Sequence, residues 1–331
     1  MPYACPPSIT VVITAYNIQE YIKTAIDSVL EQNYPDIEIL IVDDGSQDDT
    51  VDVAINALAN YKHCRIIRQD NTGPGGARNM GICSAEAEYI LFLDGDDWLA
   101  ENALSRLTAL ASTKTHAVFS NRVRYCEKSG RSIDDFVFTS VSSGPVSTGR
   151  GLLRRFAVHG KLFRRSFLID YGILFPELRI WEDYPFSYKV LAAAGCIDVI
   201  TDVTYVLRRR VEGNPSLTQS NRLADVKLYD RFSQIEMDLD IVNTSGLKKI
   251  FPKCDFVRHE FQDRLLVDVK YLLLEKNLDV RFRAFEAIAK FLEKHADSAL
   301  ASVNQSTTEI FNAIINRDLG LTLTLISKYI V

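Results

Sequence analysis

The sequence lacks the features that define several common classes of protein. Its six cysteines are scattered over 331 residues without a CxxC pair, which argues against a zinc site or a disulfide framework. A net charge of −5 provides no general positive field for binding nucleic acid. No apolar run approaches the about 20 residues of a membrane-spanning helix, and the N-terminus lacks the pattern of a signal peptide. We therefore expect a cytoplasmic protein without a nucleic-acid partner.

What the sequence does contain is a regular alternation of strand and helix patterns. Composition is that of a globular protein, with 47% hydrophobic and 24% charged residues. Asn17 and Glu20 resemble a capping box for a helix that ends near Leu30. Strands alternating with helices predict an α/β fold with a parallel sheet, in which ligands bind outside the carboxyl ends of the strands. The runs that predict strands are 9–16, 37–46, 64–69, 89–93, 116–126, 135–140 and 199–210.

The run 89–99 carries the most informative polar residues. An apolar stretch typical of a buried strand ends abruptly in Asp94, Gly95, Asp96 and Asp97. Carboxylates gathered at the end of a buried strand repel one another and need a compensating cation. Hard oxygen ligands suit Mg²⁺ or Mn²⁺. The alternative is an acidic turn that caps the following helix, expected over 102–112.

A glycine-rich segment, residues 71–82, follows the third predicted strand. It matches neither GxGxxG nor GxxxxGK[ST], so it is a poor signature for a dinucleotide site or a P-loop. One interpretation is a turn that leads into a helix, with Pro74 in the first turn. The other is a loop whose glycines let the backbone approach a nucleotide, with Arg78 directed at its base or phosphates.

A second acidic motif, Glu182–Asp183, precedes a helix expected over 186–194. Acids favour the N-terminal end of a helix dipole, but a carboxylate here can also serve as a general base. His159 is interpreted as a hydrogen-bonded surface histidine in preference to a catalytic one. The adjacent arginines 208–210 can neutralise phosphate charge.

The C-terminal third reads as almost entirely helical, with apolar residues at three- and four-residue steps. Such stripes favour core or subunit packing. Contact with a membrane surface is less favoured because the charges are mixed in sign. A homo-oligomer or a peripheral membrane contact through these helices remains an open alternative.

Five segments, in this order, resemble the motifs of family 2 glycosyltransferases. The resemblance covers about residues 8–215 and implies the GT-A fold, a Rossmann-like mixed sheet flanked by helices. It also implies inverting transfer of a sugar from a UDP-sugar, with Mn²⁺ or Mg²⁺ as cofactor. The segments are TVVITAYN (10–17), IEILIVDDGSQDDT (37–50), NTGPGGARNMGI (71–82), YILFLDGDDW (89–98) and WEDYPF (181–186).

The same resemblance implies roles for individual residues. In the pair Glu182–Asp183 the aspartate is the implied catalytic base. Asp96 is the implied metal ligand, and Asp94 lies near both the ribose and the metal. The implied nucleotide-sugar-binding residues are Thr14, Ala15, Tyr16, Asp44, Asn71, Gly73, Arg78, Asp94 and Gly95.

The extent of the resemblance and the helical pattern after it together predict how the chain is divided. Residues 1–218 are expected to form the GT-A domain, with a nucleotide-binding half (1–115) and an acceptor half (116–218). Residues 219–331 would form a helical domain. The loop from Arg208 to Ser216 resembles the segment that folds over the pyrophosphate, with Arg208 and Arg210 as its candidate contacts.

These roles lead to one principal hypothesis and two rivals. The principal one is an inverting, metal-dependent transferase that acts on a glycan or lipid-linked glycan acceptor in cell-surface polysaccharide synthesis, either free in the cytoplasm or at the inner face of the membrane. A nucleotide-sugar-binding scaffold without activity is the first rival, but a binder needs no acid pair. A nucleotidyltransferase would need a basic, glycine-rich signature after the first strand, where ITAYNIQE stands instead.

Overall fold

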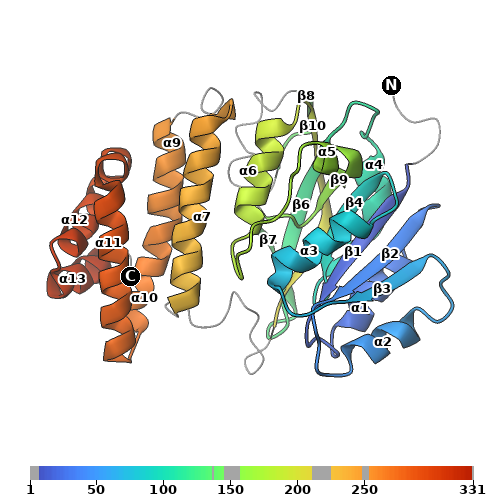
Figure 1. The fold of residues 1–331 in the computed structure, drawn as a ribbon, viewed down its shortest axis with the longest axis horizontal. Helices are drawn as coiled ribbons and strands as arrows, with labels where there is room; N and C mark the ends of the chain where they lie inside the picture. Colours follow the sequence, from blue (N-terminus) through green and yellow to red (C-terminus); the bar gives the residue numbers. More distant parts are fainter. Residues whose placement is uncertain (1–6, 136–137, 145–156, 211–224, 248–252, 330–331) are drawn as a thin grey trace. The chain divides into compact units, whose positions relative to one another are not determined.

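The computed structural model describes residues 7–135, 138–144, 157–210, 225–247 and 253–329 (Figure 1). The chain forms two compact units. The first comprises the residues up to Leu178 together with Glu182–Asn214, and the second comprises Arg179–Trp181 and the chain from Pro215 onward. The domain boundary expected at residue 218 lies outside the described residues.

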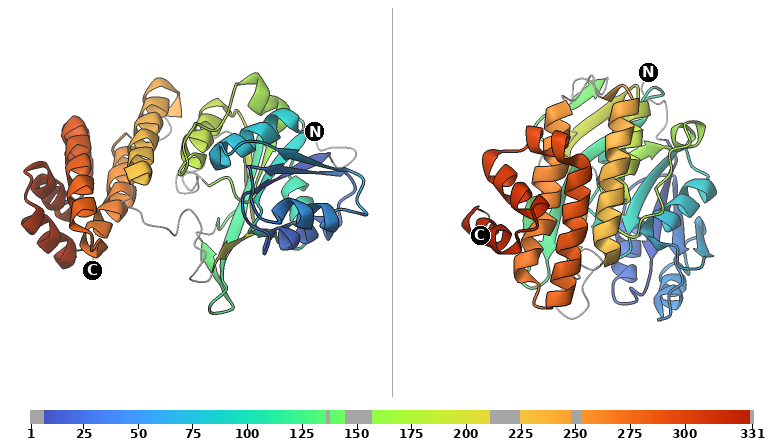
Figure 2. Two further views of the ribbon diagram at one scale, coloured as in Figure 1. Left: turned by 60° about the horizontal axis from the view of Figure 1, so that its bottom comes forward. Right: turned by 60° about the vertical axis from the view of Figure 1, so that its left-hand side comes forward.

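A ten-stranded sheet, as far as the described residues extend, is the centre of the first unit (Figures 1 and 2). Its order is β3-β2-β1-β4-β9-β6-β10-β5, with β7 beside β6 and β8 beside β10. The first four strands are parallel, whereas β9 runs antiparallel to both β4 and β6. The strands are β1 (Ile9–Ala15), β2 (Ile37–Asp43), β3 (Cys64–Arg68), β4 (Tyr89–Asp94), β5 (Trp98–Leu99), β6 (Ala117–Cys126), β7 (Arg131–Asp135), β8 (Ser142–Gly144), β9 (Lys161–Arg164) and β10 (Ile197–Arg209).

Helices flank this mixed sheet, which confirms the predicted fold class. Side chains of β1 alternate between its faces: Val11 joins the core cluster that includes α1 and α4, while Val12 faces α3. A Cβ at Gly81 of α3 would lie 2.3 Å from Val12 Cγ1, so only glycine lets α3 approach this closely. The helices are α1 (Ile22–Leu30), α2 (Thr50–Ala57), α3 (Gly73–Ser84), α4 (Ala103–Thr108), α5 (Arg165–Asp170) and α6 (Asp183–Ala193).

Two local predictions are wrong. Asn17 does not cap a helix: it has φ 50°, its Oδ1 accepts a hydrogen bond from Gln47 N, and α1 begins only at Ile22. The sequence predicts a strand over 135–140, of which 136–137 lie outside the described residues and 138–140 are not in a strand; the observed β7 spans Arg131–Asp135 and pairs antiparallel with β6. The reason is a tight reversal in which Gly130, at φ 62°, donates to the carbonyl of Cys126 and returns the chain early.

The second unit is helical in its described part. The apolar stripes predicted there are mostly buried within the unit, with Phe261, Leu265 and Ile288 fully covered, whereas Phe282 is exposed. No helix among the described residues is long and apolar enough to cross a membrane. The helices are α7 (Asp225–Thr244), α9 (Lys253–Arg258), the π-helical η3 (His259–Leu265), α10 (Leu266–Leu274), α11 (Leu278–Ser302), α12 (Gln305–Ile315) and α13 (Leu319–Tyr329).

Candidate active site

Strand register brings the polar ends of β1, β2 and β4 together at the carboxyl edge of the sheet. Ala15 lies opposite Asp43, and Thr14 lies opposite Asp94. Asp44 N donates to Ala15 O over 2.8 Å, and Thr14 Oγ1 donates to Asp94 Oδ1 over 3.3 Å. Because these strands are parallel, residues from three separate motifs lie together at one edge of the sheet.

The Asp44 carboxylate shapes the loop that leads into α3. It is buried and accepts hydrogen bonds from Gln69 Nε2, from Thr72 N and from Gly73 N at 2.8–2.9 Å. Asp43, also buried, accepts from Ser46 N and pairs with Arg68. Both carboxylates therefore have hydrogen-bond or ion-pair partners within the protein.

An aromatic cluster fixes the position of α6. Phe186 stacks on Phe175 with 3.9 Å between ring centroids, and it meets Phe163 and Phe92 edge-on. These rings hold the first turns of the helix against β4 and β9, so that Glu182, its N-cap, faces α3. A Cβ at Gly75 would lie 3.2 Å from Glu182 Cγ and 3.0 Å from Pro176 O. A glycine in the first turn of α3 thus makes room for the acid pair.

Arg78 joins the two acidic motifs. Its side chain is buried; Nη2 donates to Asp94 Oδ1 over 2.7 Å, and Nη1 forms an ion pair with Glu182. Burial opposes its charge, but the surrounding carboxylates raise the pKa of Arg78. The sequence predicts Arg78 as a contact for the base or phosphates of a nucleotide. In the structure its side chain links β4 to α6.

The two members of the acid pair have different surroundings. Burial raises the pKa of Glu182 to about 7, and the charge of Asp183 adds to this effect, while Arg78 opposes it. Asp183 is the first residue of α6 and partly exposed. Among the described residues its carboxylate has no hydrogen-bond partner. Asp183 is consequently the carboxylate that is available to an incoming group.

Arginines from the end of β10 hold the turn after β4. Arg210 pairs with Asp96 Oδ2, with Nη2 at 2.7 Å, and Arg208 Nε donates to the Asp96 carbonyl over 2.7 Å. Arg208 also pairs with Glu127, whereas Arg209 is exposed. Alternation along the strand thus directs 208 and 210 to the acidic turn and 209 to solvent. Burial raises the pKa of Asp96 in spite of Arg210.

Asp97 has a structural environment. It is buried, accepts from the Tyr205 hydroxyl over 2.6 Å, and accepts from Arg208 N over 2.7 Å. Burial and the neighbouring Asp96 and Asp94 raise the pKa of Asp97 well above its usual range. Its contacts fasten β10 to the acidic turn.

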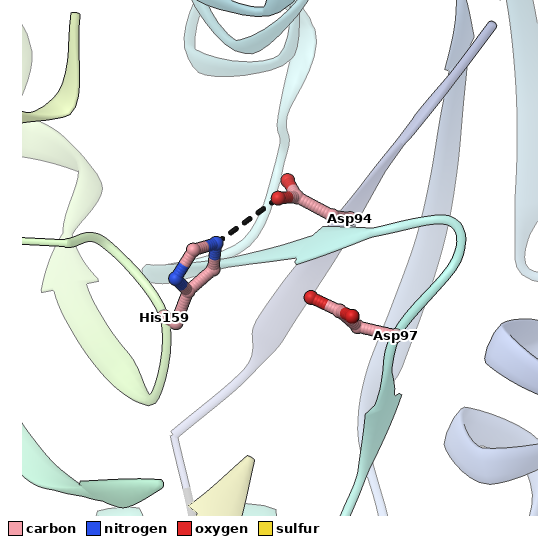
Figure 3. Close-up of side chains that lie close together, drawn as sticks. All are labelled: Asp94, Asp97 and His159. Atoms are coloured by element: carbon pink, nitrogen blue, oxygen red, sulfur yellow. Dashed lines mark hydrogen bonds and ion pairs between the residues drawn. The ribbon is translucent and has the colours of Figure 1, made fainter. Parts of the chain in front are cut away.

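His159, which the sequence favoured as a surface residue, lies inside the site (Figure 3). Its Nε2 is 3.0 Å from Asp94 Oδ2 and its Nδ1 is 2.6 Å from Arg122 Nη1. Burial alone would raise the pKa of Asp94, but Arg78 and His159 hold it well below its usual range. In the sequence, the step from His159 through Gly160 indicates a place where the chain can pass close to a ligand, whereas nothing in the sequence singles out Arg122 or Tyr205.

The donor set fits a divalent cation. Ligand atoms of Asp94, Asp97 and His159 all lie within 4.8 Å of one another, and Figure 3 shows their side chains grouped around the end of β4. Asp96 is on the same turn, and its Oδ2 pairs with Arg210. Carboxylate oxygens suit Mg²⁺ or Mn²⁺, and imidazole is a further ligand type for transition metals. Asp97 already accepts from the Tyr205 hydroxyl and from Arg208 N, so Asp94, Asp96 and His159 remain as the candidate ligands.

The remaining predicted residues lie along the same edge with different exposure. Tyr16 is 47% exposed at the end of β1, and Asn71 is exposed before α3. Gly73 and Gly95 are buried, and Gly95 N donates to Thr14 O over 2.9 Å. The structure therefore brings the predicted residues to one rim, although their assigned roles remain predictions.

The chain is similar in sequence to a known protein family and to several of its members. Residues 10–172 match the family Glycosyl transferase family 2. The chain is 35% identical over 219 residues to the glycosyltransferase GlyG of Streptococcus pneumoniae, covering 61% of this chain and 71% of GlyG. It is 28% identical over 279 residues to the putative glycosyltransferase EpsH of Bacillus subtilis, covering 75% of this chain and 81% of EpsH. The chain belongs to glycosyltransferase family 2.

A solved structure has the same fold. Residues 1–349 of Staphylococcus aureus TarS, in complex with UDP-GlcNAc, superpose with a TM-score of 0.79 at 21% sequence identity. The superposition covers 97% of this chain and 91% of that one. It shows that the GT-A fold and the helical region that follows it occur together in another protein.

Proposed function

We propose that this protein transfers a sugar from a UDP-sugar to a hydroxyl group of a glycan or lipid-linked glycan, with inversion and with the aid of Mn²⁺ or Mg²⁺. Membership of the glycosyltransferase family supports the reaction class. The observation that carries the assignment to this site is the Arg78 bridge, which ties the acidic turn after β4 to the acid pair at α6.

Asp183 is the proposed catalytic base. A general base must reach the acceptor hydroxyl with an oxygen that can accept its proton. Asp183 is partly exposed and has no hydrogen-bond partner among the described residues, whereas Glu182 is buried against Arg78. In the reaction the acceptor oxygen forms a bond to the anomeric carbon while the bond from that carbon to the UDP oxygen breaks. The acceptor proton passes to Asp183, and UDP leaves with the bonding electrons. A single displacement of this kind inverts the configuration at the anomeric carbon.

The nucleotide is proposed to bind along the carboxyl edge. Tyr16 and Asn71 offer exposed side chains for the nucleoside, and the backbone from Thr14 to Tyr16 lies beside it. Asp44 is the proposed partner of uracil, a role it would combine with its hydrogen bonds to Thr72 and Gly73. Gly95, a further proposed contact, lets the acidic turn lie close to β1, since a Cβ there would be 2.8 Å from Thr14 O.

Asp94 and Asp96 are the proposed ligands of the divalent cation, with His159 as a further candidate. When bound, the cation would stabilise the negative charge that develops on the departing diphosphate. Arg208 and Arg210 are proposed to face the same diphosphate. In the present structure Arg210 supplies the positive charge beside Asp96, and the pairing keeps this buried acid compensated.

The donor and acceptor classes are proposed by analogy with a relative. TarS is named a poly(ribitol-phosphate) β-N-acetylglucosaminyltransferase, and its structure is known with UDP-GlcNAc. The matched region covers 62% of this chain but only 36% of TarS. We therefore propose polysaccharide synthesis as the process, and UDP-GlcNAc as the first donor to test.

The test is a panel of UDP-sugars, beginning with UDP-GlcNAc and UDP-glucose, assayed for UDP release with and without Mn²⁺. Donor binding raises the stability of the folded protein, so a thermal shift identifies binders independently of turnover. We expect one donor to raise the thermal stability of the protein and to release UDP in the presence of Mn²⁺. In the presence of EDTA the same donor should release no UDP. Binding without turnover by the wild-type protein, with any acceptor supplied, would support the scaffold instead.

A further inference from the structure

His159 connects residues from the two strands on either side of β9. One edge of β9 pairs with β4 and the other pairs with β6, so the residues just before β9 lie between those two strands. Through Nε2 the His159 ring reaches Asp94, at the end of β4, over 3.0 Å. Through Nδ1 it reaches Arg122, in β6, over 2.6 Å. All three residues belong to the first unit, so their arrangement is defined within it.

The backbone that follows His159 is fixed closely against β6. Gly160 has φ 66°, which favours glycine, and a Cβ there would lie 2.8 Å from Ser120 Oγ. Its carbonyl accepts from Ser120 N over 3.0 Å and from Ser120 Oγ over 2.7 Å. The His159 ring also packs on Tyr205, with 4.9 Å between ring centroids. The surroundings therefore set the position of the imidazole.

The contact with Arg122 decides which nitrogen of His159 carries the hydrogen. A guanidinium has only N–H donors and no acceptor, so Nδ1 is the acceptor in this contact. In a neutral imidazole the other nitrogen then carries the hydrogen. Nε2 consequently donates to Asp94 Oδ2. A metal ion needs a nitrogen lone pair, and in this form Nε2 has none to offer while that of Nδ1 is engaged by Arg122.

Asp94 is held at both of its carboxylate oxygens. Oδ1 accepts from Arg78 Nη2 over 2.7 Å and from Thr14 Oγ1 over 3.3 Å. Oδ2 accepts from His159. Each carboxylate oxygen has about two acceptor positions, so among the contacts of the described residues one position, on Oδ2, is left for a ligand. The direction of that position depends on the hydrogen bond from His159.

We infer that Arg122 and His159 form a hydrogen-bonded pair that positions the Asp94 carboxylate for the nucleotide: Arg122 fixes the Nε2–H form of His159, and His159 donates to Oδ2. The inference rests on the proposed function, in which Asp94 contacts the ribose and the cation. It narrows the candidate ligands of the cation to Asp94 and Asp96. Arg122 and His159 are positioning residues, because they act on the nucleotide through Asp94.

The hydrogen on His159 can be observed directly by ¹⁵N NMR of the full-length protein without ligand. The chain has five histidines, and the signals that disappear in His159→Gln identify this ring. We expect Nδ1 to have the chemical shift of an unprotonated nitrogen and Nε2 that of a protonated one. In Arg122→Met the Nδ1 signal should move, whereas Arg106→Met, which removes an exposed arginine paired with Asp202, should leave it unchanged. A ring protonated at Nδ1 contradicts the inference.

The Kd for UDP, measured by calorimetry with and without Mn²⁺, tests what the pair does for the nucleotide. In His159→Leu we expect this Kd to rise about 10-fold, the effect of losing a hydrogen bond to a charged group. His159→Gln should restore most of the affinity, since its amide N–H can donate to Asp94 while its oxygen accepts from Arg122. His63→Leu, at an exposed histidine, is the matched control and should leave the Kd unchanged.

Electron spin-echo spectroscopy of bound Mn²⁺ separates positioning from metal ligation. This measurement detects an imidazole nitrogen that is coordinated directly to the ion. We expect no such signal from the wild-type protein with Mn²⁺ and UDP. A nitrogen signal that is present in the wild-type protein and lost in His159→Gln would make His159 a metal ligand, and the inference would be wrong.

The outcomes separate the inference from the proposed function. If UDP binds wild type and His159→Leu equally well, the inference is wrong and the proposed function stands. If His159→Leu and His159→Gln lose UDP affinity and thermal stability alike, the histidine has a general structural role and the inference is again wrong. If neither UDP nor any UDP-sugar binds the wild-type protein, the proposed function is wrong, and the NMR spectrum alone decides whether the pair exists. Loss of affinity in His159→Leu with rescue by His159→Gln, together with a hydrogen on Nε2, supports the inference.

Discussion

Two groups of adjacent acids, the turn after β4 and the start of α6, differ in how their charges are compensated. In the turn every carboxylate has a partner: Asp94 has Arg78 and His159, Asp96 has Arg210, and Asp97 has the Tyr205 hydroxyl. At α6, Glu182 pairs with Arg78, but Asp183 has no hydrogen-bond partner in the part of the chain that the structure describes and is partly exposed.

The difference matches the two chemical tasks of the proposed reaction. Acids gathered to hold a cation repel one another when the cation is absent, and the arginines and other donors around them offset that repulsion. An acid that accepts a proton from a substrate must have its oxygen accessible. Arg78, shared between the two groups, couples their positions. Four predictions test this contrast, in order of decreasing effect.

The first prediction concerns the accessible acid. Asp183→Asn keeps the size of the side chain but removes the proton acceptor, so the rate of sugar transfer should fall about 10²–10⁴-fold, the usual contribution of a general base. UDP affinity, measured by calorimetry, should remain near the wild-type value. Asp170→Asn, an exposed acid at the end of α5, serves as the control and should leave both quantities unchanged.

The second prediction concerns the shared arginine. Arg78→Met leaves Glu182 buried and Asp94 partly buried without their cation, and removal of one partner of a buried pair typically costs about 3–5 kcal/mol of unfolding free energy. The control is Lys23→Met, which breaks the exposed pair of Lys23 with Asp27 and should cost at most about 1 kcal/mol. Urea unfolding measures both. Equal losses in the two variants would show that Arg78 does not bridge the acid groups.

The parts of this contrast that the sequence predicts are those in which the contacting residues belong to recognisable local patterns, and not those that depend on contacts between residues far apart in the chain. The edge that carries Thr14, Asp44 and Asp94 is predictable, because each residue follows an apolar run and parallel strands end at the same edge. The sequence does not predict which member of the acid pair is accessible. This depends on Gly75 and Arg78, more than a hundred positions earlier, which bury Glu182 and leave Asp183 accessible.

His159 and the arginines of β10 show the same limit. A single histidine in the sequence gives no sign of its partner, since Asp94 lies 65 positions away and meets it only through the pairing of β9 with β4. Three successive arginines do not reveal which are directed inward until β10 pairs with β6 and fixes the alternation. The second unit lies outside the region matched by the family, so no motif indicated that it holds residues 179–181.

The third prediction concerns the protonation of Glu182. Its folded-state pKa of about 7 lies above the ordinary value of 4.5, so the folded protein binds this proton more tightly than the unfolded chain does. The resulting stabilisation is complete below about pH 4.5 and is lost as pH rises to 7, with a total of about 3 kcal/mol. Urea unfolding should therefore show that wild type loses up to about 3 kcal/mol of unfolding free energy between these two pH values. Glu182→Gln lacks the titrating group and should not show this loss. Parallel pH curves for the two proteins would mean that Arg78 keeps Glu182 ionised throughout.

The fourth prediction concerns Asp97, the acid of the turn whose contacts are structural. Tyr205→Phe removes the hydroxyl that donates to Asp97 Oδ2 and accepts from Asp94 N. Leaving a buried carboxylate without this donor should cost about 1–3 kcal/mol.

Tyr61→Phe is the matched control for this fourth change. It removes a hydroxyl that donates to the neutral carbonyl of Ile37 over 2.7 Å, and it should cost only about 0.5–1.5 kcal/mol. Transfer by the folded Tyr205→Phe protein should stay within about threefold of wild type, because Asp97 fastens β10 to the turn and takes no part in the proposed chemistry. A large loss of transfer with unchanged stability would instead place Asp97 among the groups that act on the substrate, and the contrast between the two acid groups would then rest on Asp183 alone.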